Sequence, residues 1–301
     1  MIVGRFAPSP SGRMHLGNVF SALIAWLSVR SRHGKMLLRI EDLDPDRSKE
    51  LYIDALRQDL ERLGLDWDAE MPLQSSRSEI YKSYFDTLPV YPCYCSRNEL
   101  HSASAPHGTD GNLLYAGTCR SLTQAERAAK TRKPSWRVEV PDRDITFTDG
   151  VYGTVRQNLR DACGDFILRR ADGVYAYQLA VVCDDALGGV TQVVRGRDLL
   201  DSTPRQIWLY ETLGFSAPEF CHVPLLVAPD GRRLSKREAD LDLEHLWQSY
   251  TSEQIIGLIA YSCGLIPAWE QMTPKDLIPY FTWDRISREN ISILEYLPKI
   301  V

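Results

Sequence analysis

The chain has 301 residues, 44% hydrophobic and 25% charged, with a net charge of −5 and a pI of about 5.7. This is the composition of an ordinary globular protein, and its acidic balance excludes general nucleic-acid binding through a strongly basic domain. No apolar run approaches the roughly 20 residues of a membrane-spanning helix, and the N-terminus has no secretory pattern. Seven cysteines, four of them scattered singly, favour the reducing cytoplasm over a disulfide scaffold.

The first part of the chain alternates strands and helices. Residues 2–6 read as a strand, and a loop rich in proline follows. Apolar residues recur at helical spacing from Leu16 until Gly34 ends that helix. A second strand at 35–41 and a second amphipathic helix at 48–63 come next. This order predicts a parallel sheet covered by helices.

The pattern changes after Tyr91. Residues 91–120 cluster Cys, His, Gly and Ser with little periodicity. Several strand-like runs follow, at 135–140, 145–149 and 152–157, and a hairpin is expected from strands 165–170 and 174–179 around Ala171-Asp172-Gly173. We expect this mixed stretch to be inserted into the α/β framework.

The framework resumes with a strand at 192–195 and a helix at 203–213, which has Ser202 or Thr203 as N-cap and Pro204 in its first turn. The end of the chain is expected to be mostly helical, including 252–263. The predicted organisation is a catalytic first half (1–90), an inserted subdomain (91–185), a catalytic second half (186–245) and a helical connector (246–301).

A short motif, His15-Leu16-Gly17-Asn18, stands where the first helix begins. A helix N-terminus offers unpaired N–H groups and partial positive charge to phosphates, and Gly17 permits close approach of a nucleotide to the backbone. Alone, such a motif is also consistent with an ordinary helix start that carries a surface histidine.

A second motif, far along the chain, is the basic run Gly231-Arg232-Arg233-Leu234-Ser235-Lys236-Arg237. Its dense positive charge suits a polyphosphate, because catalysis at phosphates is mostly positioning and charge stabilisation. Alone, it is equally consistent with a solvated basic loop.

Together the two motifs resemble the HIGH and KMSKS motifs of class I aminoacyl-tRNA synthetases. Further blocks resemble the glutamyl-tRNA synthetase group: RFAPSPSG before the first motif, Arg39-Ile40-Glu41-Asp42-Leu43-Asp44, Tyr177-Gln178-Leu179-Ala180 with Asp184-Asp185, and Arg195-Gly196-Arg197-Asp198-Leu199-Leu200. The resemblance covers roughly residues 1–250. It implies an α/β fold: a Rossmann-type catalytic domain with an inserted acceptor-binding-like subdomain and a short helical C-terminal connector.

The resemblance implies a ligase that activates L-glutamate with ATP and Mg²⁺. Glutamate carries two carboxylates and one ammonium, so its pocket needs cations or donors and one anion. The implied glutamate-binding residues are Arg5, Phe6, Ala7, Pro8, Ser9, Glu41, Tyr177 and Arg195. The implied ATP-binding residues are His15, Gly17, Asn18 and Lys236, of which His15 and Lys236 are catalytic. Taken singly, each is equally consistent with a surface or core residue.

Three cysteines, Cys93, Cys95 and Cys119, cluster in the loop-rich insertion and predict a structural zinc site. Free thiols are the alternative. By chemistry alone, His101 or His107 would be a better fourth ligand than a phenol, whereas the resembled family uses a tyrosine at the position of Tyr115.

Only 64 residues follow Arg237, fewer than the anticodon-reading domains of complete glutamyl-tRNA synthetases need. The chain therefore resembles their truncated paralogues, the glutamyl-queuosine tRNA(Asp) synthetases, and Leu43, where full synthetases typically have Thr, agrees. This implies a monomer whose partner is tRNA(Asp) containing queuosine at the wobble position, a loop base accessible without unstacking a duplex. Candidate RNA contacts are Arg120, Arg127 and Arg132, which are also consistent with a solvated helix face.

Three other functions remain open from the sequence. The chain could charge the 3′ end of a tRNA as a minimal glutamyl-tRNA synthetase. It could be a non-catalytic RNA-binding paralogue, against which the presence of Arg5, His15, Glu41 and Lys236 argues. It could also transfer glutamate to an acceptor that is not RNA.

Overall fold

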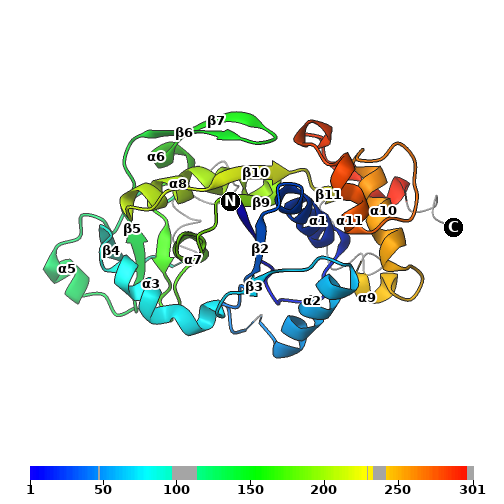
Figure 1. Cartoon of the computed structure of the whole chain (residues 1–301). Helices are drawn as coiled ribbons and strands as arrows, with labels where there is room; N and C mark the ends of the chain where they lie inside the picture. Colours follow the sequence, from blue (N-terminus) through cyan, green and yellow to red (C-terminus); the bar gives the residue numbers. More distant parts are fainter. Residues whose placement is uncertain (47, 97–113, 229, 233–241, 297–301) are drawn as a thin grey trace.

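A computed structural model of the chain describes residues 1–46, 48–96, 114–228, 230–232 and 242–296 (Figure 1). Its centre consists of five parallel strands in two adjacent sheets. The strands are β1 (Val3–Phe6), β2 (Lys35–Leu38), β3 (Ala69–Glu70), β9 (Gln192–Gly196) and β10 (Glu219–Val223). β2 pairs with β1 and β3, and β9 pairs with β10. The N–H of Thr191 donates to the carbonyl of Val3 at 2.9 Å, which places β9 beside β1. The strands β3-β2-β1 form one hydrogen-bonded sheet and β9-β10 another, and side by side their order, β3-β2-β1-β9-β10, is that of a doubly wound nucleotide-binding sheet.

Helices connect these strands as a parallel sheet requires. They are α1 (Leu16–Arg30) between β1 and β2, α2 (Glu50–Arg62) between β2 and β3, and α8 (Thr203–Thr212) between β9 and β10. α1 is buried on almost every side because it contacts both β1 and β9 and also the C-terminal helices. A helix that is apolar around most of its circumference needs such a position. The predicted strand–helix order is therefore confirmed here.

The inserted stretch forms separate antiparallel sheets, with β4 and β5 at the left of Figure 1 and the pair β6 and β7 along the top. One joins β4 (Val90–Cys93), β5 (Ser135–Val138) and β8 (Ile167–Arg169), and the other is the hairpin of β6 (Asp144–Asp149) and β7 (Gly153–Asn158). Its helices are α5 (Gln124–Ala128) and α6 (Leu159–Ala162). The 3₁₀ turn η1 (Gln74–Arg77) and the helix α3 (Ser78–Phe85) precede this stretch, and the 3₁₀ turn η2 (Arg197–Ser202) follows β9.

The hairpin predicted for 165–170 and 174–179 is wrong in its second half. β8 forms as expected, and Tyr175 makes one isolated bridge back to Arg169. From Tyr177, however, the chain is the helix α7 (Tyr177–Leu187). Its buried apolar residues form an unbroken run, residues 179–183, that packs in the same core as β9. Because such a run has no period of its own, the sequence pattern does not distinguish a strand from a buried helix here.

The C-terminal part is mostly helical, as predicted, and packs on α1. Its elements are α9 (Leu243–Leu246), α10 (Ser252–Ser262), α11 (Pro274–Leu277) and the 3₁₀ turns η4 (Ile278–Tyr280), η5 (Trp283–Arg285) and η6 (Ile293–Glu295). Ile255, Ile256 and Ile259 of α10 join the same core as α1. The short strand β12 (Ile291–Ser292) pairs with β11 (Leu226–Val227), which ties this part to the catalytic framework. The exact division of the chain into four parts stays a prediction.

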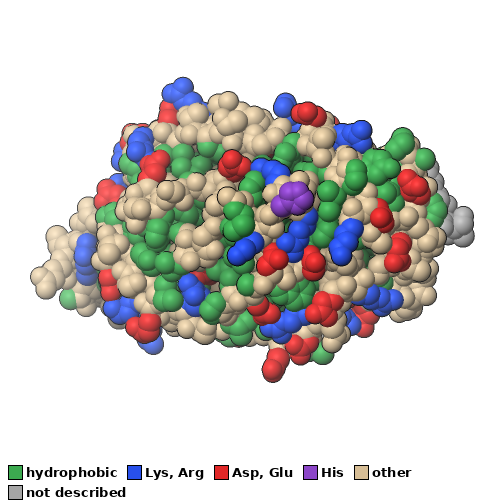
Figure 2. Space-filling view, viewed as in Figure 1, with side chains coloured by type: hydrophobic (Ala, Val, Ile, Leu, Met, Phe, Trp, Pro, Cys, Tyr) green, Lys and Arg blue, Asp and Glu red, His purple; other side chains and the backbone are tan. Residues whose placement is uncertain are grey.

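Basic and acidic side chains are interspersed over the face shown in Figure 2. That face carries no broad patch of one sign, in keeping with the net charge of −5. No helix in the described part of the chain combines the length and apolarity needed to cross a bilayer.

Candidate active site

A cavity of about 890 Å³ opens at the carboxyl ends of β1 and β9. These two strands lie where the strand order reverses, which is where doubly wound sheets bind their ligands. The structure brings together here every described residue that the sequence proposed for glutamate and ATP: Arg5, Phe6, Ala7, Pro8, Ser9, His15, Gly17, Asn18, Glu41, Tyr177 and Arg195. The remaining one, Lys236, lies outside the described residues, as does most of its basic motif.

The start of α1 forms one wall of this cavity. His15 is the N-cap: its Nδ1 accepts from the N–H of Gly17 at 3.1 Å, and Asn18 Oδ1 accepts from the N–H of His15 at 3.1 Å. In the neutral ring, the proton is therefore on Nε2. A Cβ on Gly17 would lie 3.0 Å from two atoms of the His15 ring, so glycine is what allows this arrangement.

A buried charge cluster forms the floor of the site. Asp185, on α7, accepts from Arg5 Nε at 3.3 Å and also from Arg39 Nη1, while Arg39 Nη2 donates to Glu41 at 2.9 Å. Burial alone would raise the pKa of Asp185, but Arg39 and Arg5 outweigh it and hold that pKa below its ordinary value. Burial raises the pKa of Glu41, against the opposing effect of the same arginines. The sequence placed Arg39 and Asp185 in family blocks, but their role as the support of Arg5 and Glu41 was missed.

Arg195 enters the cavity from the end of β9. Its Nε donates to His222 Nε2 at 3.0 Å, and its Nη2 donates to Thr203 Oγ1 at 2.9 Å and to the carbonyl of Leu199 at 3.3 Å. Its Nη1 is buried and has no hydrogen-bond partner among the described residues. Burial lowers the pKa of this guanidinium, and no described carboxylate forms an ion pair with it. The site thus holds a buried cation with one donor nitrogen to offer.

A second cavity, of about 390 Å³, adjoins the first and shares Ser9, Ser11, Glu41 and Tyr177 with it. Its other walls come from the loop after β2, from η1 and from the segment before α7: Leu43, Asp44, Ser48, Gln74, Arg170, Val174, Tyr175 and Ala176. The Nε2 of Gln74 donates to Asp184 at 2.7 Å, and since a carboxylate only accepts, this contact fixes the amide orientation. The buried Oε1 of Gln74 has no partner within the described chain.

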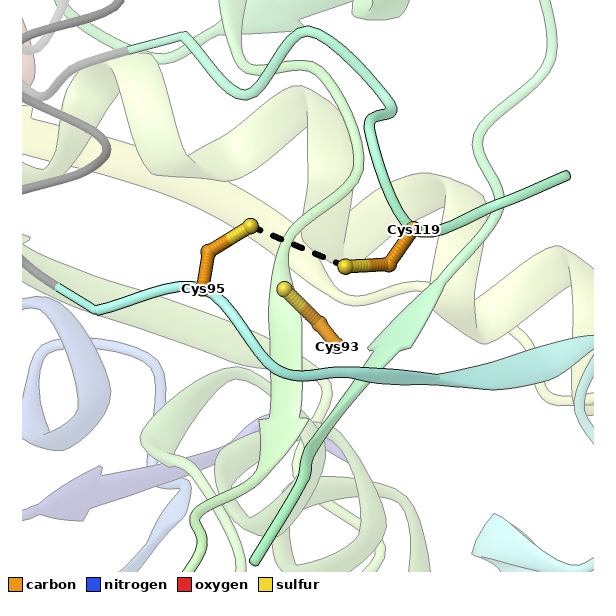
Figure 3. A group of neighbouring side chains, drawn as sticks. All are labelled: Cys93, Cys95 and Cys119. Atoms are coloured by element: carbon orange, nitrogen blue, oxygen red, sulfur yellow. Dashed lines mark hydrogen bonds between the residues drawn. The ribbon is translucent and has the colours of Figure 1, made fainter. Parts of the chain in front are cut away.

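The three clustered cysteines converge at the end of β4 (Figure 3). The sulfurs of Cys93, Cys95 and Cys119 all lie within 4.8 Å of one another, and that of Cys95 is 3.6 Å from that of Cys119. Tetrahedral zinc with Zn–S bonds of about 2.3 Å places ligand sulfurs roughly 3.8 Å apart, so the trio fits zinc. The hydroxyl of Tyr115 accepts from the N–H of Cys119 at 2.6 Å and so lies beside the trio. His101 lies outside the described residues, and so does His107.

The arginines considered for RNA contact have different surroundings. Arg120 donates to Asp165 at 2.6 Å and pairs with Glu139 at 3.4 Å, so its charge is already compensated within the protein. Arg127 is half-buried on α5, and Arg132 is exposed.

Known proteins of one family are similar to this chain over most of its length. The family model of class I tRNA synthetases (E and Q), catalytic domain, matches residues 1–260. The chain is 48% identical to the Glutamyl-Q tRNA(Asp) synthetase of Symbiobacterium thermophilum, covering 97% of this chain and 96% of that protein. It is 46% identical to the protein of that name from Nitratidesulfovibrio vulgaris, covering 92% and 91%.

Among solved structures, the glutamate-tRNA synthetase of Elizabethkingia anophelis superposes with a TM-score of 0.84 at 27% identity, covering 99% of this chain and 69% of that one. A glutamate tRNA ligase from Elizabethkingia meningosepticum, solved in complex with its amino acid, superposes with a TM-score of 0.83 at 26% identity, covering 99% and 68%. The predicted fold class is therefore confirmed. The chain belongs to the class I tRNA synthetases of the glutamate and glutamine type.

Proposed function

We propose that this protein activates L-glutamate with ATP and transfers it to queuosine at the wobble position of tRNA(Asp). The observation that carries the proposal is the meeting, in one cavity, of the His15–Gly17 helix start with two buried arginines and Glu41. Relatives 43–48% identical to the chain carry the name Glutamyl-Q tRNA(Asp) synthetase, which supports the acceptor. The finer expectations, a monomer in the cytoplasm, belong to the same proposal.

In the first step, an oxygen of the glutamate α-carboxylate attacks the α-phosphorus of ATP. The bond from that phosphorus to the bridging oxygen breaks, and pyrophosphate leaves with the electron pair. Mg²⁺ bound to ATP would neutralise phosphate charge. His15 and Lys236 would stabilise the charge that develops on the phosphates, and the start of α1 would bind them.

In the second step, a hydroxyl oxygen of queuosine attacks the acyl carbon of glutamyl-adenylate. The bond between that carbon and the phosphate oxygen breaks, AMP leaves with the electron pair, and the hydroxyl proton passes to the departing phosphate. Binding and positioning supply this catalysis, so the protein needs no covalent nucleophile.

The roles in glutamate binding follow from charge. Arg195 offers to a carboxylate its Nη1, which has no partner in the described ranges, and Arg5, held by Asp185, lines the same cavity. We assign the ammonium group to Glu41, a carboxylate of this cavity that also pairs with Arg39, and Ser9 and Tyr177 supply hydroxyls.

The second cavity is the place we propose for the acceptor nucleoside. It shares the Glu41–Tyr177 wall with the glutamate cavity, so a ring held there would lie beside the activated carboxyl group. Its polar lining is rich in acceptors, including Asp44, Glu41 and the fixed Oε1 of Gln74. A ligand that presents hydroxyl and amine donors, as queuosine does, complements such a lining.

We also propose a structural zinc held by Cys93, Cys95, Cys119 and Tyr115. Bound there, zinc would join the end of β4 to the segment around Cys119, which have little apolar core of their own.

The test is ATP-dependent transfer of labelled glutamate to purified tRNA(Asp), with and without queuosine. Both tRNAs are trimmed of the 3′-terminal adenosine, so that only the wobble base can accept. Label on the queuosine form alone is the expected result. Label on neither trimmed form, with efficient charging of intact tRNA(Glu), would show a 3′-end synthetase instead, the alternative that the likeness to glutamate-tRNA synthetases favours.

A further inference from the structure

A buried chain of polar groups extends behind Arg195, away from the cavity. His222, on β10, is fully buried, and its Nε2 accepts from Arg195 Nε at 3.0 Å. Its Nδ1 lies 2.6 Å from Oδ2 of Asp149, at the end of β6. Neither residue belongs to a motif in the sequence, and 73 positions separate them.

The proton positions along this chain are determined by chemistry. An arginine Nε–H can only donate, so His222 Nε2 must carry a lone pair, and its ring proton is on Nδ1, donated to Asp149. Backbone groups hold Asp149 in place. Its Oδ1 accepts from the backbone N–H groups of Val151 and Tyr152, both at 2.9 Å, and its Oδ2 accepts from the backbone N–H of His222 at 3.1 Å. Burial lowers the pKa of His222, which agrees with a neutral ring.

The consequence for Arg195 is a guanidinium anchored on two sides. Nε is held by His222, and Nη2 by Thr203 and the carbonyl of Leu199, while Nη1 alone has no described partner. All of these direct partners are neutral, so the cation stays available for an anion. Because the plane of the Arg195 guanidinium is fixed before the ligand binds, binding does not carry the entropy cost of ordering this long side chain.

We propose that His222, oriented by Asp149, is a positioning residue that presets Arg195 for a carboxylate of the amino-acid substrate. The proposal rests on the proposed function, because it takes Arg195 as a glutamate ligand. His222 touches neither glutamate nor ATP, so it acts only through the angle and position of the guanidinium.

The test compares three variants in glutamate-dependent ATP–pyrophosphate exchange. His222→Gln retains one acceptor and one donor, whereas His222→Leu has neither. Both oxygens of Asp149 accept from N–H donors, so in Asp149→Asn the amide NH₂ faces another donor whichever way the amide is turned. The variant therefore no longer keeps the His222 ring proton on Nδ1. We expect His222→Leu and Asp149→Asn to raise the KM for glutamate roughly tenfold or more, with the KM for ATP unchanged and His222→Gln close to wild type.

Two further measurements keep the outcomes distinct. The ring ¹⁵N shifts of His222 in the wild-type protein, which need no variant, should show a neutral ring protonated on Nδ1, and protonation on Nε2 would overturn the proposal. Equal KM values for glutamate in folded His222→Leu and wild type would also overturn it. Wild-type protein without glutamate-dependent exchange would instead overturn the proposed function, and with it the role of Arg195.

Discussion

Asp185 is the buried anion that holds the floor of the site together, and replacing it with asparagine should be strongly destabilising. Its side chain is 2% exposed and contacts Arg5, 4% exposed, and Arg39, which is fully buried. Asparagine keeps the shape but leaves both cations without their shared carboxylate. Breaking a buried ion pair from one side costs about 3–5 kcal/mol, so we expect Asp185→Asn to lower the free energy of unfolding by about that amount.

The assay is urea-induced unfolding followed by circular dichroism, with Glu70→Gln as the matched control. Glu70 also pairs with an arginine, Arg57, at 3.2 Å, but both side chains are about one-third exposed. Such a surface pair contributes at most about 1 kcal/mol. If Asp185→Asn costs no more than Glu70→Gln, the view of Asp185 as the charge that supports the site is wrong.

The loss of stability caused by Asp185→Asn should depend on pH. The folded-state pKa of Asp185 is held below its ordinary value of 3.8, so its contribution to stability is fully present above that pH. It is lost as the pH falls from 3.8 through the folded-state pKa. The stability difference between wild type and Asp185→Asn should therefore shrink on acidification below pH 3.8 and stay constant above it.

Three other outcomes are expected. Elemental analysis should find one zinc per chain in the wild type and none in Cys119→Ser; equal zinc content in the two proteins would exclude the site. Gly257→Ala places a Cβ 1.9 Å from the carbonyl of Glu270 and should cost about 1–3 kcal/mol or more in urea unfolding. Gly153→Ala is its control, with a φ of +76° but open space around the Cβ, so it should lose only the roughly 1–2 kcal/mol that a left-handed backbone costs an L-residue. Val174→Phe, which narrows the second cavity, should reduce the rate of glutamate transfer to tRNA about tenfold or more while leaving pyrophosphate exchange near wild type. An equal loss in both assays would show that the acceptor does not bind in that cavity.

The parts of this molecule that could be predicted from the sequence are those with local signals. α1 has a cap and apolar residues at helical spacing, and cysteines are rare enough for three in one segment to stand out. The glycine expected to end this helix, Gly34, lies beyond its observed end at Arg30, where Ser31 is the C-cap. By contrast, α7 begins in a run of β-branched and aromatic residues, and only its packing shows that it is a helix.

The pairing of the residues that support the site carries no local signal. Asp149 and His222 meet only because β6 and β10 are neighbours, and Arg39 meets Asp185 across 146 positions. Arg39 and Asp185 lie in the same sequence blocks as ligand-facing residues, whereas Asp149 and His222 belong to no motif. Lys236 and the roles assigned to individual side chains stay predictions.

The adjacency of β1 and β9 also sets the order in which the protein can be built. The contact between Val3 and Thr191 spans 188 positions, so the ligand cavity has no second wall until the ribosome has released the residues of β9 and β10. Until then, one edge of β1 stays unpaired while the inserted stretch is being made, and contacts of this sequence separation form slowly. Nascent chains therefore pass through a stage in which β1, α1 and β2 have been synthesised but no cavity can bind substrate. Glutamate or ATP can stabilise the fold only after β9 has packed beside β1.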